Sequence, residues 1–160
     1  MFQNLDWQLQ LHWLCLVGIA GLLGAVIGLE REIAGKPAGL RTHIFICAGS
    51  ALFMLLGRAI VESFDMAQAT VGAPTISADP VRIMQAIVVG ISFMGAGTII
   101  HHGNDRVHGL TTASTIFLVA AIGIAVAISQ LILAVFVTIA SVIVLVILGM
   151  LERFFTKRHA

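Results

Sequence analysis

The chain has 160 residues, of which 59% are hydrophobic and only 11% are charged, and its mean hydropathy is +1.03. Soluble globular domains are about half apolar and about a quarter charged, so lipid is the solvent for most of this protein. A formal net charge of +1 excludes the dense basic surface that nucleic-acid binding needs, and we expect no nucleic-acid partner.

Charged residues divide the chain into apolar stretches. The long stretches without Asp, Glu, Lys or Arg are 7–29, 42–57, 83–104 and 107–151. A membrane-spanning helix needs about 20 mainly apolar residues, and the last stretch is long enough for two, with Ser129-Gln130 as the polar pair near its middle. The sequence therefore predicts an all-α membrane protein, one transmembrane domain of five helices over residues 9–29, 42–61, 80–100, 111–128 and 131–151.

The distribution of Lys and Arg predicts how the helices are oriented. Basic residues collect in the cytoplasmic loops of membrane proteins. With five spans, seven of the nine basic residues fall on one side, in the first loop, the third loop and the C-terminal tail: Arg31, Lys36, Arg41, Arg106, Arg153, Lys157 and Arg158. We predict that the N-terminus lies outside and the C-terminus in the cytoplasm.

Glycines at helical spacing predict close helix packing. The candidates are Gly24 and Gly28 in the first span and Gly90, Gly95 and Gly97 in the third. Small residues let helix backbones approach closely in lipid, so we expect packing within the bundle or within a homodimer or other homo-oligomer. Alternatively, the segment Gly95-Ala96-Gly97-Thr98 loosens its helix and presents backbone carbonyls to an ion or substrate.

Several charges stand at the ends of the predicted spans. Glu30, Arg31 and Arg41 lie at the cytoplasmic ends of the first two spans, on the same side as Arg106. Glu30 with Arg41 or Arg106 is expected to form a partly buried ionic cluster, which either holds the helix ends together or binds an ion or partner.

Two further charge pairs are expected next to helix ends. Asp79 precedes Pro80 and can cap the third helix, and Arg82 stands three residues later, so Asp79 and Arg82 can pair. Glu32 can pair with Lys36 if the first helix continues by one turn.

The sequence contains no motif for enzymatic chemistry. It lacks a GxxxxGK[ST] phosphate loop and an HExxH metal motif, and no Asp, Glu, Lys or Arg lies near the middle of a predicted span. Magnesium prefers carboxylate and water oxygens, and the available carboxylates Glu30, Glu32 and Asp79 lie at membrane boundaries. We expect no enzymatic activity and no cofactor, and Mg²⁺ is a candidate ligand.

Three segments in a fixed order resemble the membrane domain of the MgtC/SapB family. They are "GLEREIAGKPAGLRTHIFICAGSALF", "DPVRIMQAIVVGISFMGAGTII" and "VHGLTTASTIFLVAAIGIAVA". The resemblance places the family's motif residues on Glu30, Arg31, Gly39, Arg41 and Thr42, then Asp79, Arg82, Gly90, Gly95, Ala96 and Gly97, then Gly109, Leu110, Thr111 and Thr112. The sequence departs from the family at His108, where Arg is common, and at Phe117, where Trp is common.

The resemblance implies a bacterial inner-membrane protein that acts when magnesium is limiting or under stress. It implies regulation of other membrane proteins, notably the ATP synthase, and the alternative is a transporter or channel for magnesium, another cation or a small solute. Longer members carry a cytoplasmic ACT-like domain after the last span. Because this sequence ends nine residues after Leu151, we expect the short form without that domain.

Overall fold

The computed structural model describes residues 7–71, 79–102 and 106–156. In these residues five helices form: α1 (Trp7–Ile33), α2 (Leu40–Val71), α3 (Pro80–Gly97), α4 (Leu110–Ala127) and α5 (Leu131–Thr156). Each contains a stretch that is long and apolar enough to cross a membrane. The predicted all-α membrane protein with five spanning helices is thereby confirmed, and its orientation stays a prediction.

The second helix is longer than predicted. We expected the span to end at Val61, but α2 continues to Val71, and its apolar spanning part ends at Phe64. Arg58 and Glu62 stand one turn apart on the exposed surface of α2, with 3.2 Å between Nη2 and Oε1. This pairing of opposite charges at i and i+4 supports the last turns of the apolar part, from which the helix continues.

The third helix is shorter than predicted. We expected it to reach Ile100, but α3 ends at Gly97, and the Gly95 carbonyl accepts hydrogen bonds from both the backbone N–H and the hydroxyl of Thr98, at 3.0 and 2.8 Å. Strand β1 (Ile100–His102) follows and pairs antiparallel with β2 (Arg106–His108). Glycine is a poor helix former, which explains the stop before Ile100.

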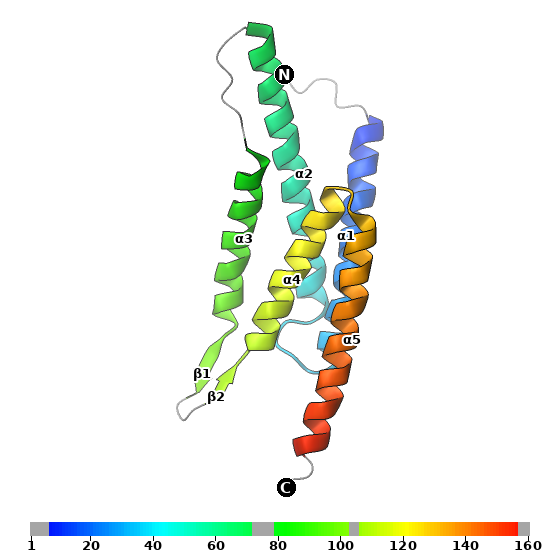
Figure 1. The fold of residues 1–160 in the computed structure, drawn as a ribbon, viewed down its shortest axis with the longest axis vertical. Helices are drawn as coiled ribbons and strands as arrows, with labels where there is room; N and C mark the ends of the chain where they lie inside the picture. The colour runs from blue at the N-terminus through cyan, green and yellow to red at the C-terminus, as the bar shows by residue number, and fades with distance from the viewer. Residues whose placement is uncertain (1–6, 72–78, 103–105, 157–160) are drawn as a thin grey trace.

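The break between the last two helices lies where the sequence predicts it. α4 ends with Ile128 as its C-cap, and Ser129 takes a left-handed conformation with φ of 63°. The backbone N–H of Gln130 bonds back to the Ala125 carbonyl at 2.8 Å. The polar pair therefore makes a tight turn, and α4 and α5 run antiparallel (Figure 1).

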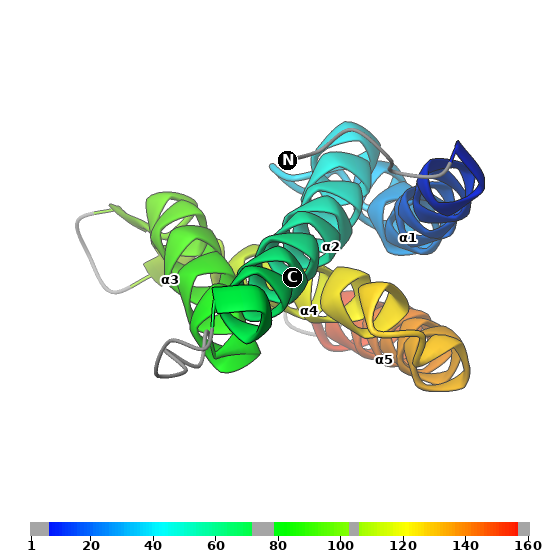
Figure 2. The ribbon, with the colours of Figure 1, turned by 90° about the horizontal axis from the view of Figure 1, so that it is seen from above.

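The core of the bundle lies among α1, α2 and α4. In the most apolar stretch of α4, 56% of the residues are buried, against 11% in α3 and in α5. Figure 2 shows α3 at one edge of the bundle and α1 and α5 at the other, with α2 and α4 between them. The loop between α1 and α2, the β1–β2 hairpin and the C-terminal end of α5 all lie toward one end (Figure 1).

Candidate functional site

The loop between α1 and α2 is held by capping at both of its ends. Gly35 has φ of +65°, and the N–H groups of Gly35 and Lys36 return to the carbonyls of Glu32 and Arg31 at 3.0 Å each, which is a Schellman motif. The Glu32 carboxylate accepts a 2.7 Å hydrogen bond from the backbone N–H of Leu40 at the start of α2. Glu32 therefore does not pair with Lys36, because its carboxylate satisfies an otherwise unpaired N–H at the helix N-terminus.

Gly24 and Gly28 bring the backbone of α1 against that of α2. A Cβ added at Gly24 would lie 2.5 Å from the carbonyl oxygen of His43, and one at Gly28 would lie 2.9 Å from the Cα of Leu40. Real Cβ atoms essentially never come this close to backbone. The GxxxG pair thus lies in the contact between α1 and α2, as close packing in lipid requires.

A third glycine, Gly123, brings α4 against the backbone of α2. A Cβ added at Gly123 would come well inside 3.0 Å of the Cys47 carbonyl oxygen. Gly24 approaches the side chain of the same cysteine from α1, since an added Cβ would lie 2.8 Å from the Cβ of Cys47. This part of α2 is consequently enclosed by two neighbouring helices.

A buried histidine links α2 to α4 immediately beside these contacts. His43 has no exposed surface, its Nδ1 lies 2.8 Å from the Gly39 carbonyl oxygen, and its Nε2 lies 3.2 Å from Oγ1 of Thr115. The Thr115 hydroxyl in turn donates to the Thr112 carbonyl at 2.9 Å. The chain of polar contacts therefore runs from the start of α2 into the first turns of α4.

A buried ion pair on α1 lies near this histidine. The Arg31 side chain is 4% exposed and that of Glu30 is 16% exposed. Their contact is bidentate. Nη2 of Arg31 donates to Oε1 of Glu30 at 2.7 Å, and Nε of Arg31 donates to Oε2 of Glu30. We call Glu30, Arg31, His43 and Thr115 the His43 cluster.

The geometry corrects one predicted partner of Glu30, Arg41, and leaves the other, Arg106, untested. Arg41 is exposed and forms no ion pair within the described residues, while the Glu30 carboxylate is occupied by its neighbour Arg31. Arg106 lies on β2 opposite His102, and its side chain lies outside the described part of the chain. The ionic contact is therefore made within α1, at the turn that precedes the loop.

The charges at the start of α3 do not pair with each other. The Asp79 carboxylate accepts the backbone N–H of Val81 at 2.9 Å, as the capping prediction requires. Arg82 is exposed, and no ion pair joins it to Asp79 among the described residues. The Asp79 carboxylate caps the N-terminus of α3 instead.

The remaining motif glycines differ in their surroundings. Gly95 is buried, and its added Cβ would make an ordinary 3.6 Å contact with Ala113 of α4. Gly90 and Gly97 have no described atom within 4 Å of an added Cβ. Gly109 has φ of +93°, and its added Cβ would overlap the Thr98 carbonyl oxygen, so the hairpin and the start of α4 need glycine here.

The motif residues after Gly109 form the first turn of α4. Thr112 is buried, and its carbonyl accepts a hydrogen bond from the Thr115 hydroxyl, whereas Leu110 and Thr111 are exposed. Thr112 is therefore joined to the His43 cluster through the hydroxyl of Thr115.

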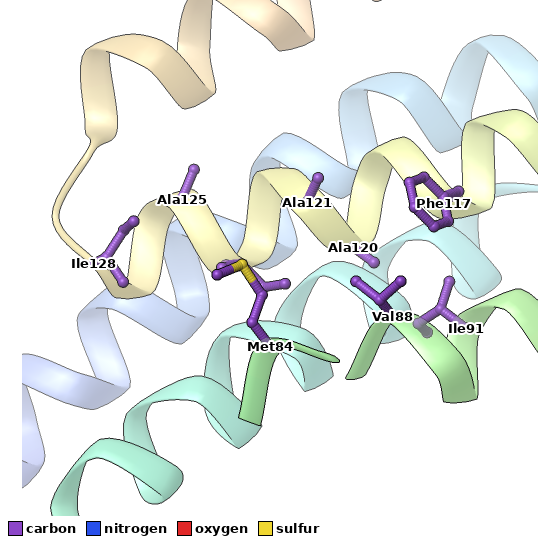
Figure 3. A pocket seen from close by; sticks show the side chains of 9 residues that line it. Met84, Val88, Ile91, Phe117, Ala120, Ala121, Ala125 and Ile128 are labelled. Carbon is purple, nitrogen blue, oxygen red and sulfur yellow. The ribbon is translucent and has the colours of Figure 1, made fainter. Parts of the chain in front are cut away.

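An apolar groove of about 210 Å³ lies between α3 and α4. Figure 3 shows Met84, Val88 and Ile91 of α3 opposite Phe117 and Ala120 of α4. Its lining is hydrocarbon and the Met84 thioether, which suits lipid or an apolar side chain better than a hydrated cation.

The residues missed at the sequence level are His43, Thr115 and Gly123. His43 lies inside an apolar stretch directly after the motif residues Arg41 and Thr42, and an ionisable side chain in a span is itself a functional signal. In the described residues, no group of three or more His, Cys, Asp or Glu side chains is placed to hold a metal ion.

Comparison with known proteins identifies the family. The family model described as "MgtC family" matches residues 17–154, so the chain belongs to this family. The match begins within α1, ends within the last turn of α5 and includes the whole His43 cluster. No solved structure matches the chain.

Three curated relatives show the range of similarity. Protein SapB of Bacillus subtilis is 38% identical over 121 residues, which are 76% of this chain and 50% of the relative. The putative magnesium transporter YhiD of Escherichia coli K12 is 44% identical over 108 residues, 66% of this chain and 46% of the relative. Protein MgtC of Brucella abortus is 36% identical over 110 residues, 69% of this chain and 40% of the relative. The chain thus spans about half the length of the curated relatives it matches.

Proposed function

We propose that this member of the MgtC family is a non-enzymatic protein of the bacterial inner membrane that serves magnesium homeostasis by binding and regulating other membrane proteins. The link to magnesium is supported by the name of the Escherichia coli relative, a putative magnesium transporter. The regulatory part is supported chiefly by one observation, the exposure of α3. Partners are then other membrane-spanning helices, in the ATP synthase for example, or a second copy of this chain.

The exposed surface of α3 is suited to a neighbouring helix. Only 11% of its apolar stretch is buried within the chain, and the surface around Gly90 and Gly97 is open. Small residues permit close backbone approach between helices in lipid. α3 is also held at the edge of the bundle, where a partner can reach it without displacing α1, α2 or α4 (Figure 2).

Copurification from native membranes tests the regulatory proposal. The tagged chain, expressed under magnesium limitation, is expected to carry a stoichiometric membrane protein. Gly90→Leu fills the open surface of α3 and should reduce that recovery, whereas Gly18→Leu, at an equally open position on α1, is the matched control. Preparations that contain only copies of this chain, or equal losses in both variants, would contradict regulation through α3.

Cation transport is the second candidate function, and the name of the Escherichia coli relative favours it. Purified protein in liposomes should then pass magnesium along a concentration gradient. Asp79→Ser removes the candidate carboxylate ligand but keeps a side chain that can cap α3, so it should abolish the flux without unfolding the helix end. Flat magnesium, potassium and proton traces with the unmodified protein would exclude transport.

A further inference from the structure

Arg41 is a charge in the span of α2 without a counter-charge among the described residues. The apolar spanning part, Leu40–Phe64, contains three Asp, Glu, Lys or Arg side chains. Two of them, Arg58 and Glu62, pair with each other. Arg41 is exposed at the start of this part, and no described carboxylate pairs with it. A guanidinium keeps its charge at a membrane boundary, so its counter-charge comes from its surroundings.

The carboxylates closest to Arg41 in the sequence already have partners. Glu30 is bonded to Arg31, and the Glu32 carboxylate accepts a backbone N–H at the start of α2. Lys36, in the loop before Arg41, is also exposed and forms no ion pair in the part of the chain that the structure describes. The segment from Glu30 to Arg41 has three positive and two negative side chains, so its net charge is +1. The groups left unpaired at this end of α2 are therefore cations.

The exposed side of α2 that follows Arg41 is apolar. Phe45 and Leu52 lie on the same side of the helix as Arg41 and are 74% and 42% exposed. Between them lies Gly49, where an added Cβ would meet no described atom within 4 Å. One leaflet of the hydrocarbon core is about 15 Å deep, or about ten residues of helix, so these residues span one leaflet. We call Arg41, Phe45, Gly49 and Leu52 the α2 face.

We propose that the α2 face binds one phospholipid with an anionic headgroup. The Arg41 guanidinium donates to the headgroup phosphate, whose oxygens fit its planar fork, and an acyl chain lies along Phe45, Gly49 and Leu52. A zwitterionic headgroup brings an ammonium group with its phosphate, which Arg41 and Lys36 repel. The unpaired cations therefore favour a lipid with a net negative charge.

Charge also distinguishes a lipid from a second copy of this chain on the same face. Two copies related by a two-fold axis across the bilayer would bring Arg41 of one against Arg41 of the other. Like charges at short range repel, and the carboxylates of both copies are already bonded within their own loops. A phosphate supplies the charge that a second copy lacks.

Tryptophan fluorescence at the α2 face tests the proposal in bilayers. Phe45→Trp places an aromatic reporter on the face, and lipids with brominated acyl chains quench tryptophan on contact. The unmodified chain, with Trp7 and Trp13 near the other end of α1, gives the background. In phosphatidylcholine vesicles, brominated phosphatidylglycerol should be preferred over brominated phosphatidylcholine by at least about fivefold. Added salt should lower this preference.

Variants in the Phe45→Trp background assign the preference to Arg41. Arg41→Gln should lower it by about fivefold, whereas Arg41→Lys keeps the charge and should retain most of it. Arg82→Gln removes an exposed charge at the start of α3 and is the matched control, which should leave the preference unchanged. Equal quenching by the two lipids, or equal preferences in Arg41→Gln and Arg82→Gln, would overturn the proposal. Weak quenching by both lipids would also overturn it, because protein would then cover the α2 face.

Discussion

Gly123 of α4 lies against the backbone of α2 at Cys47, so closely that no side chain at position 123 fits beside the Cys47 carbonyl oxygen. Gly24 of α1 approaches the same residue from another helix. These two contacts hold the segment of α2 that follows His43. The packing of three helices through glycine thus fixes the geometry of the polar contacts next to it.

Gly123→Ala should destabilise the chain. The added methyl group must push α4 away from the backbone of α2, and such overpacking costs about 1–3 kcal/mol. Gly149→Ala on α5 is the control, because its added Cβ meets no described atom within 4 Å and alanine favours the helix. Thermal unfolding in nanodiscs should show a lower Tm for Gly123→Ala only, and an unchanged Tm would contradict the close approach.

Gly109→Ala should cost more stability than Gly35→Ala. Both glycines have positive φ, +93° and +65°, which an alanine adopts at a cost of about 1–2 kcal/mol. At Gly35 the added Cβ meets open space, whereas at Gly109 it overlaps the Thr98 carbonyl oxygen. The difference between the two Tm values measures the clash at the base of the hairpin, and equal losses would show that Thr98 moves away freely.

Glu32→Ala should destabilise the start of α2, and Lys36→Ala should not. The carboxylate caps the Leu40 N–H, and loss of a helix cap costs about 1 kcal/mol. A Cβ at Gly39 would overlap the same carboxylate, so Gly39→Ala should be costly in the native background and nearly neutral beside Glu32→Ala. Unfolding of the unmodified chain, Glu32→Ala, Gly39→Ala and the double variant in one double-mutant cycle checks this, and additive losses would rule out the coupling.

The membrane helices could be predicted from the sequence because their apolar stretches are bounded by charges and by turn residues. Ser129-Gln130 marked the turn correctly, since a polar pair inside a long apolar run favours a break. The end of α3 was misplaced because two hydrogen bonds from Thr98 to the Gly95 carbonyl close the helix before the apolar residues Ile99 and Ile100. Hydropathy alone does not contain that information.

The candidate site was predicted only in part. Glu30 and Arg31 stand out as charges next to a GxxxG helix, but their mutual pairing does not follow from spacing, since neighbours in a helix do not usually face each other. Thr115 is separated from His43 by 72 positions. Their contact depends on how α2 and α4 pack, which a single sequence does not give.

Breaking the buried ion pair should cost far more stability than breaking the exposed one. Arg31 is nearly inaccessible, so Glu30→Gln leaves a buried guanidinium without its counter-charge, at a cost of roughly 3 kcal/mol. Arg58→Ala removes the pair with Glu62, whose side chains are 51% and 55% exposed, and should cost below about 1 kcal/mol.

The double variant Glu30→Gln with Arg31→Met separates the pair from each charge alone. Because both charges are removed together, no uncompensated group stays buried, and the loss should be smaller than the sum of the two single losses. Thermal unfolding of the four proteins in nanodiscs provides the cycle. Strictly additive losses would mean that Arg31 finds another partner once Glu30 is neutral, and Glu30 would then not be the group that balances Arg31 beside His43.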